Sequence, residues 1–179
     1  MNRILAAAHF AASKHTQQRR KNDAATPYIN HPIEVAEHLS RVGGVTDEDV
    51  LIAALLHDTV EDTDTTCEEI EQRFGPRTAS IVMECNDDKS LPKSERKRLQ
   101  VVTAAKKSDA AKLVKIADKT CNLRSLLADP PTDWNLDRQR EYFLWAEQVV
   151  AGLLGINDQL DNAVRDVLDE GKQRLGTAP

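Results

Sequence analysis

The sequence predicts an all-α protein, on three observations. Apolar residues recur at helical spacing along almost the whole chain of 179 residues, and no segment shows a convincing strand-like alternation. Only 4% of the residues are aromatic, so the core must rely on Leu, Ile, Val and Ala, which favours packed helices over a β-sandwich. No internal repeat or low-complexity segment interrupts the chain, whose length fits one compact domain. We therefore expect a single domain over residues 1–179, with about nine helices.

Start and stop signals place these helices along the chain. Pro32 is predicted in the first turn of a helix, because its missing N–H has no intrahelical partner there, and His31 is then placed at the N-cap. Thr46 with Asp49 resembles a capping box. The apolar run 50–56 predicts a helix that is buried nearly all round. Further helices are expected near residues 3–17, 66–74, 76–85, 94–106, 110–127, 136–154 and 158–168.

Charge and cysteine content exclude several classes of protein. The net charge is -5, and Lys and Arg are interspersed with acids rather than gathered in one long basic tract, which argues against general nucleic-acid binding. The cysteines Cys67, Cys85 and Cys121 form no CxxC pair, which indicates a reducing compartment and no zinc-thiolate site. No apolar run approaches the roughly 20 residues of a membrane span, and no signal peptide is recognisable. We therefore expect a cytoplasmic protein without a membrane, nucleic-acid or obligate protein partner.

A cluster of acids follows the buried helix. Asp58, Glu61, Asp62 and Asp64 come after its last apolar residue, with His57 directly before them. Negative charges at a helix C-terminus repel one another and the macrodipole, unless a cation is present. His57 and Glu61 are four residues apart, as are Asp58 and Asp62, which places each pair about 6 Å apart on one stripe. The first member of each pair, His57 or Asp58, is expected to bind a divalent metal, and the second member, Glu61 or Asp62, is expected to face a metal-bound water or the substrate. The alternative is a structural histidine beside a solvated helix end.

A second apolar helix carries an isolated carboxylate. Asp118 interrupts the segment LVKIADKTCNLR, and Asn122 follows one turn later. An unpaired acid inside such a helix is costly if it is buried. Asp118 therefore completes the metal group in our interpretation, with Asn122 bonded to a ligand or water. The alternative is that Lys115 or Lys119 neutralises Asp118 on the surface.

The ordered set His31, His57-Asp58 and Asp118 resembles the H…HD…D signature of the HD superfamily of metal-dependent phosphohydrolases. Longer segments resemble the small alarmone hydrolases related to metazoan SpoT homologues, which are stand-alone relatives of the hydrolase half of bacterial RelA/SpoT enzymes. These segments are TPYINHP (26–32), ALLHDTVEDTDTT (54–66), DDKSLPKSERKRLQ (87–100), AKLVKIADKTCNLR (111–124) and REYFLWAEQVV (140–150).

The resemblance implies a compact multi-helix HD-domain fold without a synthetase or regulatory domain. It implies an Mn²⁺-dependent enzyme of the stringent response that removes the 3′-pyrophosphate of guanosine tetra- or pentaphosphate (ppGpp or pppGpp). The products would be pyrophosphate and GDP or GTP. The implied metal ligands are His31, His57, Asp58 and Asp118. The implied catalytic acids are Glu61 and Asp62. The implied substrate-binding residues are Arg20, Lys21, Lys93, Asn122, Arg138 and Tyr142.

Several alternatives stay open at this stage. Either Glu61 or Asp62 is able to serve as the base that takes a proton from the attacking water. The same site would also serve removal of the 2′-phosphate of NADPH. A non-catalytic alarmone sensor is a third possibility, although such a protein could lose Glu61, Asp62 or a metal ligand, and all of these positions are filled. The basic runs 19–21 and 96–98 would bind the phosphate groups or form plain solvated clusters.

Overall fold

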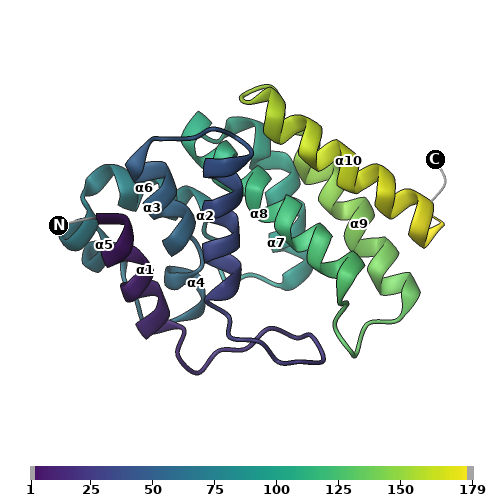
Figure 1. The fold of residues 1–179 in the computed structure, drawn as a ribbon, viewed down its shortest axis with the longest axis horizontal. Helices are drawn as coiled ribbons and strands as arrows, with labels where there is room; N and C mark the ends of the chain where they lie inside the picture. The colour runs from purple at the N-terminus through teal and green to yellow at the C-terminus, as the bar shows by residue number, and fades with distance from the viewer. Residues whose placement is uncertain (1–2, 177–179) are drawn as a thin grey trace.

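The computed structural model describes residues 3–176, which form ten α-helices and one short 3₁₀ helix, η1 (Figure 1). Their bounds are α1 Arg3–Lys14, α2 Asn30–Arg41, α3 Glu48–Leu56, α4 Thr59–Asp62, α5 Cys67–Phe74, α6 Pro76–Cys85, α7 Lys93–Thr103, η1 Ala104–Lys106, α8 Asp109–Ala128, α9 Leu136–Ala151 and α10 Asp158–Leu175. Apart from an isolated bridge between Arg19 and Pro27, these described residues contain no β-structure. The predicted all-α fold is confirmed.

The helices pack around α3 and α8. Helix α8 lies between α2 and α10, and α3 contacts α1, α2 and α6 (Figure 1). Every residue from Val50 to Leu56 is buried, as the apolar run predicts. The core consists mainly of Leu, Ile, Val and Ala, with few aromatic rings among them. Between residues 3 and 176, no helix is both long and apolar enough to cross a membrane.

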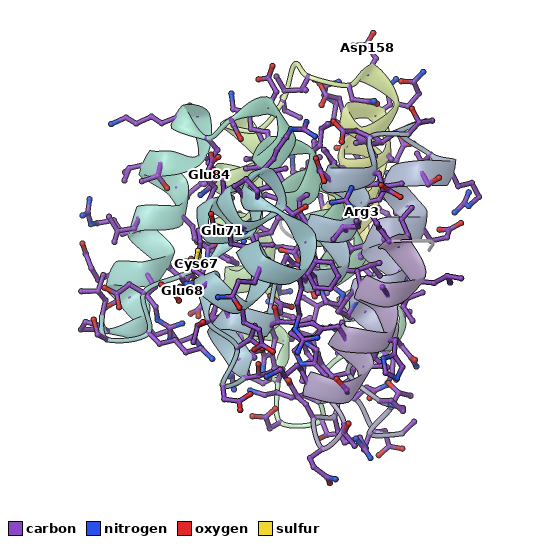
Figure 2. The ribbon with its side chains drawn as sticks, turned by 90° about the vertical axis from the view of Figure 1, so that its left-hand side faces the viewer. Arg3, Cys67, Glu68, Glu71, Glu84 and Asp158 are labelled. Atoms are coloured by element: carbon purple, nitrogen blue, oxygen red, sulfur yellow. The ribbon has the colours of Figure 1, made fainter. Side chains whose placement is uncertain are left out.

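The start of α3 differs by one residue from the predicted capping box. Asp47, not Thr46, is the N-cap, and its side chain accepts a hydrogen bond from the Asp49 N–H. The Asp49 side chain is engaged by Arg3 at 2.9 Å, while Arg3 also donates to Glu48 at 2.7 Å. This contact joins α1 to the start of α3, at the Arg3 labelled in Figure 2. The prediction for Thr46 was therefore wrong, because tertiary ion pairs redirect the carboxylate of Asp49.

The start of α2 places His31 inside the helix. Ile29 is the N-cap and His31 is the second helical residue, so the prediction of His31 at the N-cap was wrong. The His31 N–H already donates to the Tyr28 carbonyl at 3.0 Å, and this turn begins the helix earlier than the proline signal indicates. Pro32 lies in the first turn as predicted. The shift carries the His31 imidazole into the interior rather than to the helix entrance.

The acidic segment forms a helix of its own instead of the end of α3. Helix α3 stops at Leu56, because the side chain of Thr59 donates to the Leu56 carbonyl at 2.7 Å and His57 Nδ1 to the Ala54 carbonyl at 2.8 Å. These side chains satisfy carbonyls that a longer helix would have used. The catalytic candidates therefore lie in the first turn of α4, and the prediction of one continuous helix end was wrong. This extra helix raises the count above the predicted nine.

Candidate active site

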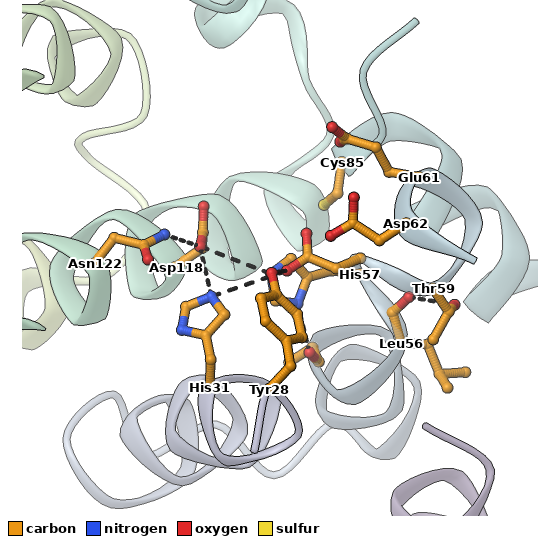
Figure 3. Close-up of polar contacts among 12 residues, drawn as sticks. Tyr28, His31, Leu56, His57, Thr59, Glu61, Asp62, Cys85, Asp118 and Asn122 are labelled. Carbon is orange, nitrogen blue, oxygen red and sulfur yellow. Dashed lines mark hydrogen bonds and ion pairs between the residues drawn. The ribbon is translucent and has the colours of Figure 1, made fainter. Parts of the chain in front are cut away.

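Four predicted side chains converge from three parts of the chain. His31 comes from α2, His57 from the end of α3 and Asp118 from α8, and these three offer ligand atoms that lie within 4.8 Å of one another. All three are buried. Asp58 joins them, since its Oδ2 lies 3.1 Å from His57 Nε2 and 4.0 Å from His31 Nε2 (Figure 3). The structure therefore brings together residues separated by as many as 87 positions.

The donor atoms of this group fit a divalent metal ion. His57 uses its Nδ1–H for the Ala54 carbonyl, so its Nε2 faces the carboxylates. That nitrogen is buried, and among the described residues it has no hydrogen-bond partner of suitable geometry. A histidine fixed through one ring nitrogen and free at the other is the usual arrangement of a metal ligand. Two imidazoles with the carboxylates of Asp58 and Asp118 form a mixed nitrogen and oxygen set that Mn²⁺, Fe²⁺ and Zn²⁺ accept.

The charges in this group stabilise one another. Burial disfavours a charged imidazole, yet the carboxylates of Asp58 and Asp118 raise the pKa of His57 well above its ordinary value. Burial likewise opposes ionisation of Asp118, but Lys119 and the two imidazoles lower its pKa. The pKa of Asp58 is also lowered, against the effect of burial, by His57 and His31. Both carboxylates are thus held ionised and ready for a cation.

Two buried lysines contact Asp118 at the carboxylate oxygen that does not face the imidazoles. Lys119 Nζ lies 3.2 Å and Lys115 Nζ 3.9 Å from Asp118 Oδ2, and both lysines are buried. The interpretation that a lysine neutralises Asp118 on the surface was therefore wrong in its location. The other oxygen, Oδ1, accepts from Asn122 Nδ2 at 2.6 Å and lies 3.1 Å from His31 Nε2. Asn122 thus orients Asp118 directly.

Glu61 and Asp62 lie next to the metal candidates on α4 (Figure 3). Glu61 accepts from the Asp87 N–H at 3.3 Å and lies 3.7 Å from Arg96. Burial, together with the negative charge of Asp87, raises the pKa of Glu61. Asp62 accepts from Lys89 at 2.5 Å and from Gln18 at 3.0 Å. Each predicted catalytic acid therefore has a cation of its own from the segment between α6 and α7 or from α7.

Two neighbouring cavities contain the predicted substrate-binding residues. A cavity of about 490 Å³ has His31 and Asp62 in its wall and is further lined by Arg20, Lys21, Asn122 and Tyr142. A second cavity of about 270 Å³ is lined by Lys93, Arg138 and, again, Tyr142. Trp134 lines both cavities and packs against Tyr142, with ring centroids 5.4 Å apart and ring planes tilted by 57°. The cations therefore form two groups with an aromatic pair between them.

The two basic runs of the sequence divide between these cavities and the solvent. Arg20 is half-buried and donates to Asn122 Oδ1 at 3.5 Å and to Ser125 Oγ at 3.1 Å. Arg96 and Lys97 line the second cavity, and Lys97 lies over the Trp145 ring at 4.7 Å. The solvated-cluster alternative fits Arg98 better, which is exposed and pairs with Glu95.

Tyr28 and Gln18 also belong to the site, although the sequence did not single them out. The Tyr28 hydroxyl donates to Asp58 Oδ2 at 2.5 Å, and Gln18 donates to Asp62. Tyr28 precedes His31 by three residues in a chain with two tyrosines, a spacing that could have indicated a contact with the metal group. Gln18 lies in a polar loop with no periodicity, so its sequence carries no such signal.

The comparisons with known proteins agree with this geometry. A family model described as HD domain matches residues 7–155. The chain belongs to the HD-domain family. It is 57% identical over 167 residues to guanosine-3′,5′-bis(diphosphate) 3′-pyrophosphohydrolase MESH1 of Mus musculus, with 93% of each chain covered. The corresponding protein of Drosophila melanogaster is 54% identical, with 85% of each chain covered.

A solved structure of this HD-domain family has nearly the same fold. It is described as "A metazoan ortholog of SpoT hydrolyzes ppGpp and plays a role in starvation responses". Its TM-score is 0.93 at 48% sequence identity, and the match covers 95% of this chain and 96% of that one. The resemblance inferred from the motifs is therefore confirmed, and so is the HD-domain fold.

Proposed function

We propose that this protein removes the 3′-pyrophosphate of guanosine tetra- or pentaphosphate, giving pyrophosphate and GDP or GTP. The observation that carries the proposal is the convergence of His31, His57, Asp58 and Asp118 beside a cavity lined by cations. The names of the relatives supply the substrate class. The mouse and fly proteins are named for this activity, and they are 57% and 54% identical in sequence to this chain.

The reaction requires a proton acceptor next to the attacked phosphorus. A bound divalent ion supplies Lewis-acid polarisation of the phosphoryl group and makes a water more acidic. Asp62 lines the cavity that contains His31, and Glu61 is its neighbour on α4 outside the lining of that cavity; we propose that one of these two carboxylates takes a proton from the attacking water. The raised pKa of Glu61 brings its basicity closer to that of an effective base at neutral pH. Arg20, fixed by Asn122 and Ser125, offers its guanidinium to phosphoryl oxygens in the cavity.

The two groups of cations suit a ligand with two oligophosphates. Arg20 and Lys21 line the first cavity, while Lys93 and Arg138 line the second. A guanosine derivative that carries diphosphates on both its 3′ and 5′ oxygens needs cations at both ends. Between the two groups, Trp134 and Tyr142 present aromatic surface that a purine base or ribose is able to contact.

We further propose Mn²⁺ as the resident metal, in one hydrolase domain over residues 1–179. The ligand set combines imidazole and carboxylate groups and has no thiolate, which supports Mn²⁺ over metal ions that prefer thiolate ligands. Cys85 and Cys121 are buried free thiols and Cys67 is half-buried, which supports a reducing compartment such as the cytosol.

The test is to incubate the purified protein with guanosine tetraphosphate and Mn²⁺ and to follow pyrophosphate release. We expect release that disappears in Asp58→Ala and persists in Asp64→Ala. Asp64 is the matched control, because it belongs to the same acidic segment but its side chain is 87% exposed and pairs with Lys14. No release by the unmodified protein, or release that survives in Asp58→Ala, would overturn the proposal.

A substrate panel separates this activity from the alternatives. NADPH should be hydrolysed less efficiently than guanosine tetraphosphate, measured as kcat/KM under the same conditions. A higher kcat/KM for NADPH would favour the 2′-phosphatase alternative. Tight binding of guanosine tetraphosphate without turnover would favour a sensor.

A further inference from the structure

His15 and Gln18 form a pair of side chains behind Asp62. His15 follows the last residue of α1, is 2% exposed, and bonds through Nδ1 to Gln18 Oε1 at 2.7 Å. Since that amide oxygen carries no proton, the imidazole nitrogen is the donor. The His15 ring also packs on the ring of Tyr28, with centroids 5.0 Å apart. The imidazole is therefore fixed in position by its packing and in orientation by its bond to Gln18.

The Gln18 amide is held between His15 and Asp62 by its two ends. Because Oε1 is engaged by His15, the NH₂ group is directed to Asp62, where Nε2 donates to Oδ2 at 3.0 Å. A flipped amide would place its oxygen against the carboxylate and lose that hydrogen bond, and it would keep the bond to His15 only if Nδ1 gave up its proton. The His15 tautomer with its proton on Nδ1 therefore favours the orientation in which Gln18 donates to Asp62.

The other contact of Asp62 is less constrained. Lys89 donates to Oδ1 at 2.5 Å, but its side chain is 49% exposed and rotates about four bonds. Gln18, in contrast, is anchored at its far end by a buried ring. The angle of the Asp62 carboxylate is thus set mainly from the Gln18 side.

The loop that carries Gln18 does not depend on this side chain for its backbone. The Arg20 N–H donates to the Thr26 carbonyl at 2.9 Å, and the Tyr28 N–H donates to the Gln18 carbonyl at 3.1 Å. These main-chain bonds close the loop independently of the amide. Replacement of the Gln18 side chain is therefore expected to leave the loop and the fold in place.

We propose that Gln18 is a positioning residue that aims the Asp62 carboxylate, and that His15 holds the Gln18 amide in the donating orientation. This inference rests on the proposed catalytic role of Asp62. A carboxylate that takes a proton from the attacking water must be held at a fixed angle, with the water in line with the phosphorus. If the carboxylate rotates freely, turnover falls even when substrate and metal still bind.

The first test replaces Gln18 with Leu, which is similar in size but has no hydrogen-bonding group. We expect kcat for guanosine tetraphosphate to fall by about 10- to 100-fold, with KM within about twofold of the unmodified protein. Mn²⁺ affinity should stay unchanged, whereas Tm should fall modestly, because the buried His15 Nδ1–H loses its acceptor. Gln17→Leu is the matched control, since Gln17 is the exposed neighbour and lines neither cavity, and it should keep full kcat. An unchanged kcat in Gln18→Leu, or a loss of Mn²⁺ binding in its place, would overturn the inference.

The second test compares two replacements of His15. His15→Asn retains an N–H donor near the position of Nδ1 but loses the ring, whereas His15→Phe retains a ring against Tyr28 but has no donor. Positioning through the amide predicts a higher kcat for His15→Asn than for His15→Phe. A purely packing role for His15 predicts the reverse order, which would contradict the proposal.

Asp62→Asn separates failure of this inference from failure of the proposed function. If Asp62→Asn loses turnover while Gln18→Leu keeps it, only the positioning role is wrong. If Asp62→Asn keeps full turnover, the proposed role of Asp62 fails and the inference fails with it. In the double variant Gln18→Leu/Asp62→Asn we expect no loss beyond that of Asp62→Asn alone, because both changes act on one group.

Discussion

The hydroxyl of Tyr28 donates to Asp58 Oδ2, the carboxylate oxygen that lies 3.1 Å from His57 Nε2. This phenol therefore orients a proposed metal ligand from within the substrate cavity, where Tyr28 is also part of the wall. Burial and the nearby Asp58 charge raise the pKa of Tyr28, so the hydroxyl keeps its proton and remains a donor.

Removal of this hydroxyl should weaken metal binding. In Tyr28→Phe we expect Mn²⁺ affinity to fall by about 10-fold, because partners of metal ligands typically contribute 10- to 100-fold to affinity. Isothermal titration with Mn²⁺ measures the change. Tyr142→Phe is the control, since Tyr142 lines both cavities without a bond to the metal group, and it should alter KM rather than Mn²⁺ affinity. Equal Mn²⁺ affinities in Tyr28→Phe and the unmodified protein would contradict this role.

The sequence predicted most of the fold because its signals were local. The run 50–56 has no polar position, and burial of every residue from Val50 to Leu56 follows directly from that. The predicted boundary between the helices 66–74 and 76–85 is confirmed, with Gly75 as the C-cap of α5 and Pro76 as the first residue of α6. The boundaries failed where side chains compete with the backbone, as at Thr59, which ends α3 by binding its carbonyl.

The candidate site was predictable only in part, because several of its residues reach it through tertiary contacts that leave no pattern in the sequence. His31, His57, Asp58 and Asp118 share a motif that a resemblance is able to identify. Lys115 and Lys119 are almost fully buried, which sequence reasoning rarely assigns to lysine. Tyr28 and Gln18 reach the site because the loop after α1 folds back on itself. The sequence of that loop has no periodic pattern that predicts this turn.

Metal removal should destabilise the protein measurably. The buried carboxylate of Asp118 and the half-buried carboxylate of Asp58 face the same two imidazoles, and a bound cation that contacts both stabilises only the folded state. Mn²⁺ at about 100 times its Kd contributes about 2.7 kcal/mol, which raises Tm by roughly 5–10 °C for a chain of this size. Differential scanning fluorimetry with Mn²⁺ and with EDTA provides the measurement. An identical Tm in both, or an equal response in an Asp58→Ala/Asp118→Ala double variant, would exclude a metal at this position.

Replacement of Lys119 should lower the free energy of unfolding, because the buried carboxylate of Asp118 then lacks its nearest lysine. Lys119 is 4% exposed and lies 3.2 Å from Asp118 Oδ2, so Lys119→Met leaves Asp118 with less compensation. Removal of one partner from a buried pair costs about 3 kcal/mol, or roughly 10 °C in Tm. We expect this loss in EDTA and a smaller one in Mn²⁺, since a cation restores part of the balance. Lys112→Met is the control, because Lys112 lies on the same helix, away from Asp118, and a similar loss there would indicate a general effect on α8.

In a plot of kcat against pH, the position of the acid limb should depend on the charge of Asp87. If Glu61 is the base, only its ionised form is active, and kcat falls as pH decreases through its raised pKa. Burial contributes most to this shift and Asp87 contributes next, so Asp87→Asn should lower the pKa of Glu61 and move the limb to lower pH. Asp88→Asn is the matched control, since Asp88 is exposed and bonds to Ser90, and its profile should coincide with that of the unmodified protein. A limb that stays in place in Asp87→Asn argues that Glu61 is not the group that titrates.

A buried histidine away from the site should make the fold sensitive to acid. Arg124 Nη1 donates to His38 Nδ1 at 3.1 Å, and since a guanidinium has no acceptor, that imidazole nitrogen must be unprotonated. Burial, with Arg124 and Arg41, lowers the pKa of His38 from 6.5 to about 4. Between these two values the unfolded chain therefore binds more protons than the folded chain. The free energy of unfolding thus rises with pH across this window, and the contribution of His38 is lost as pH falls from 6.5 towards 4.

His38→Asn removes this titration while keeping an amide oxygen that is able to accept from Arg124. We expect its free energy of unfolding, from urea titrations, to change less between pH 6.5 and pH 4 than that of the unmodified protein. His9→Asn serves as the control, because His9 is exposed on α1, and its slope should match the unmodified protein. Measuring both variants in EDTA keeps metal release at low pH out of the comparison. If His38→Asn keeps the full slope, the acid sensitivity arises from another group, and the neutral state of His38 then contributes nothing to stability in this range.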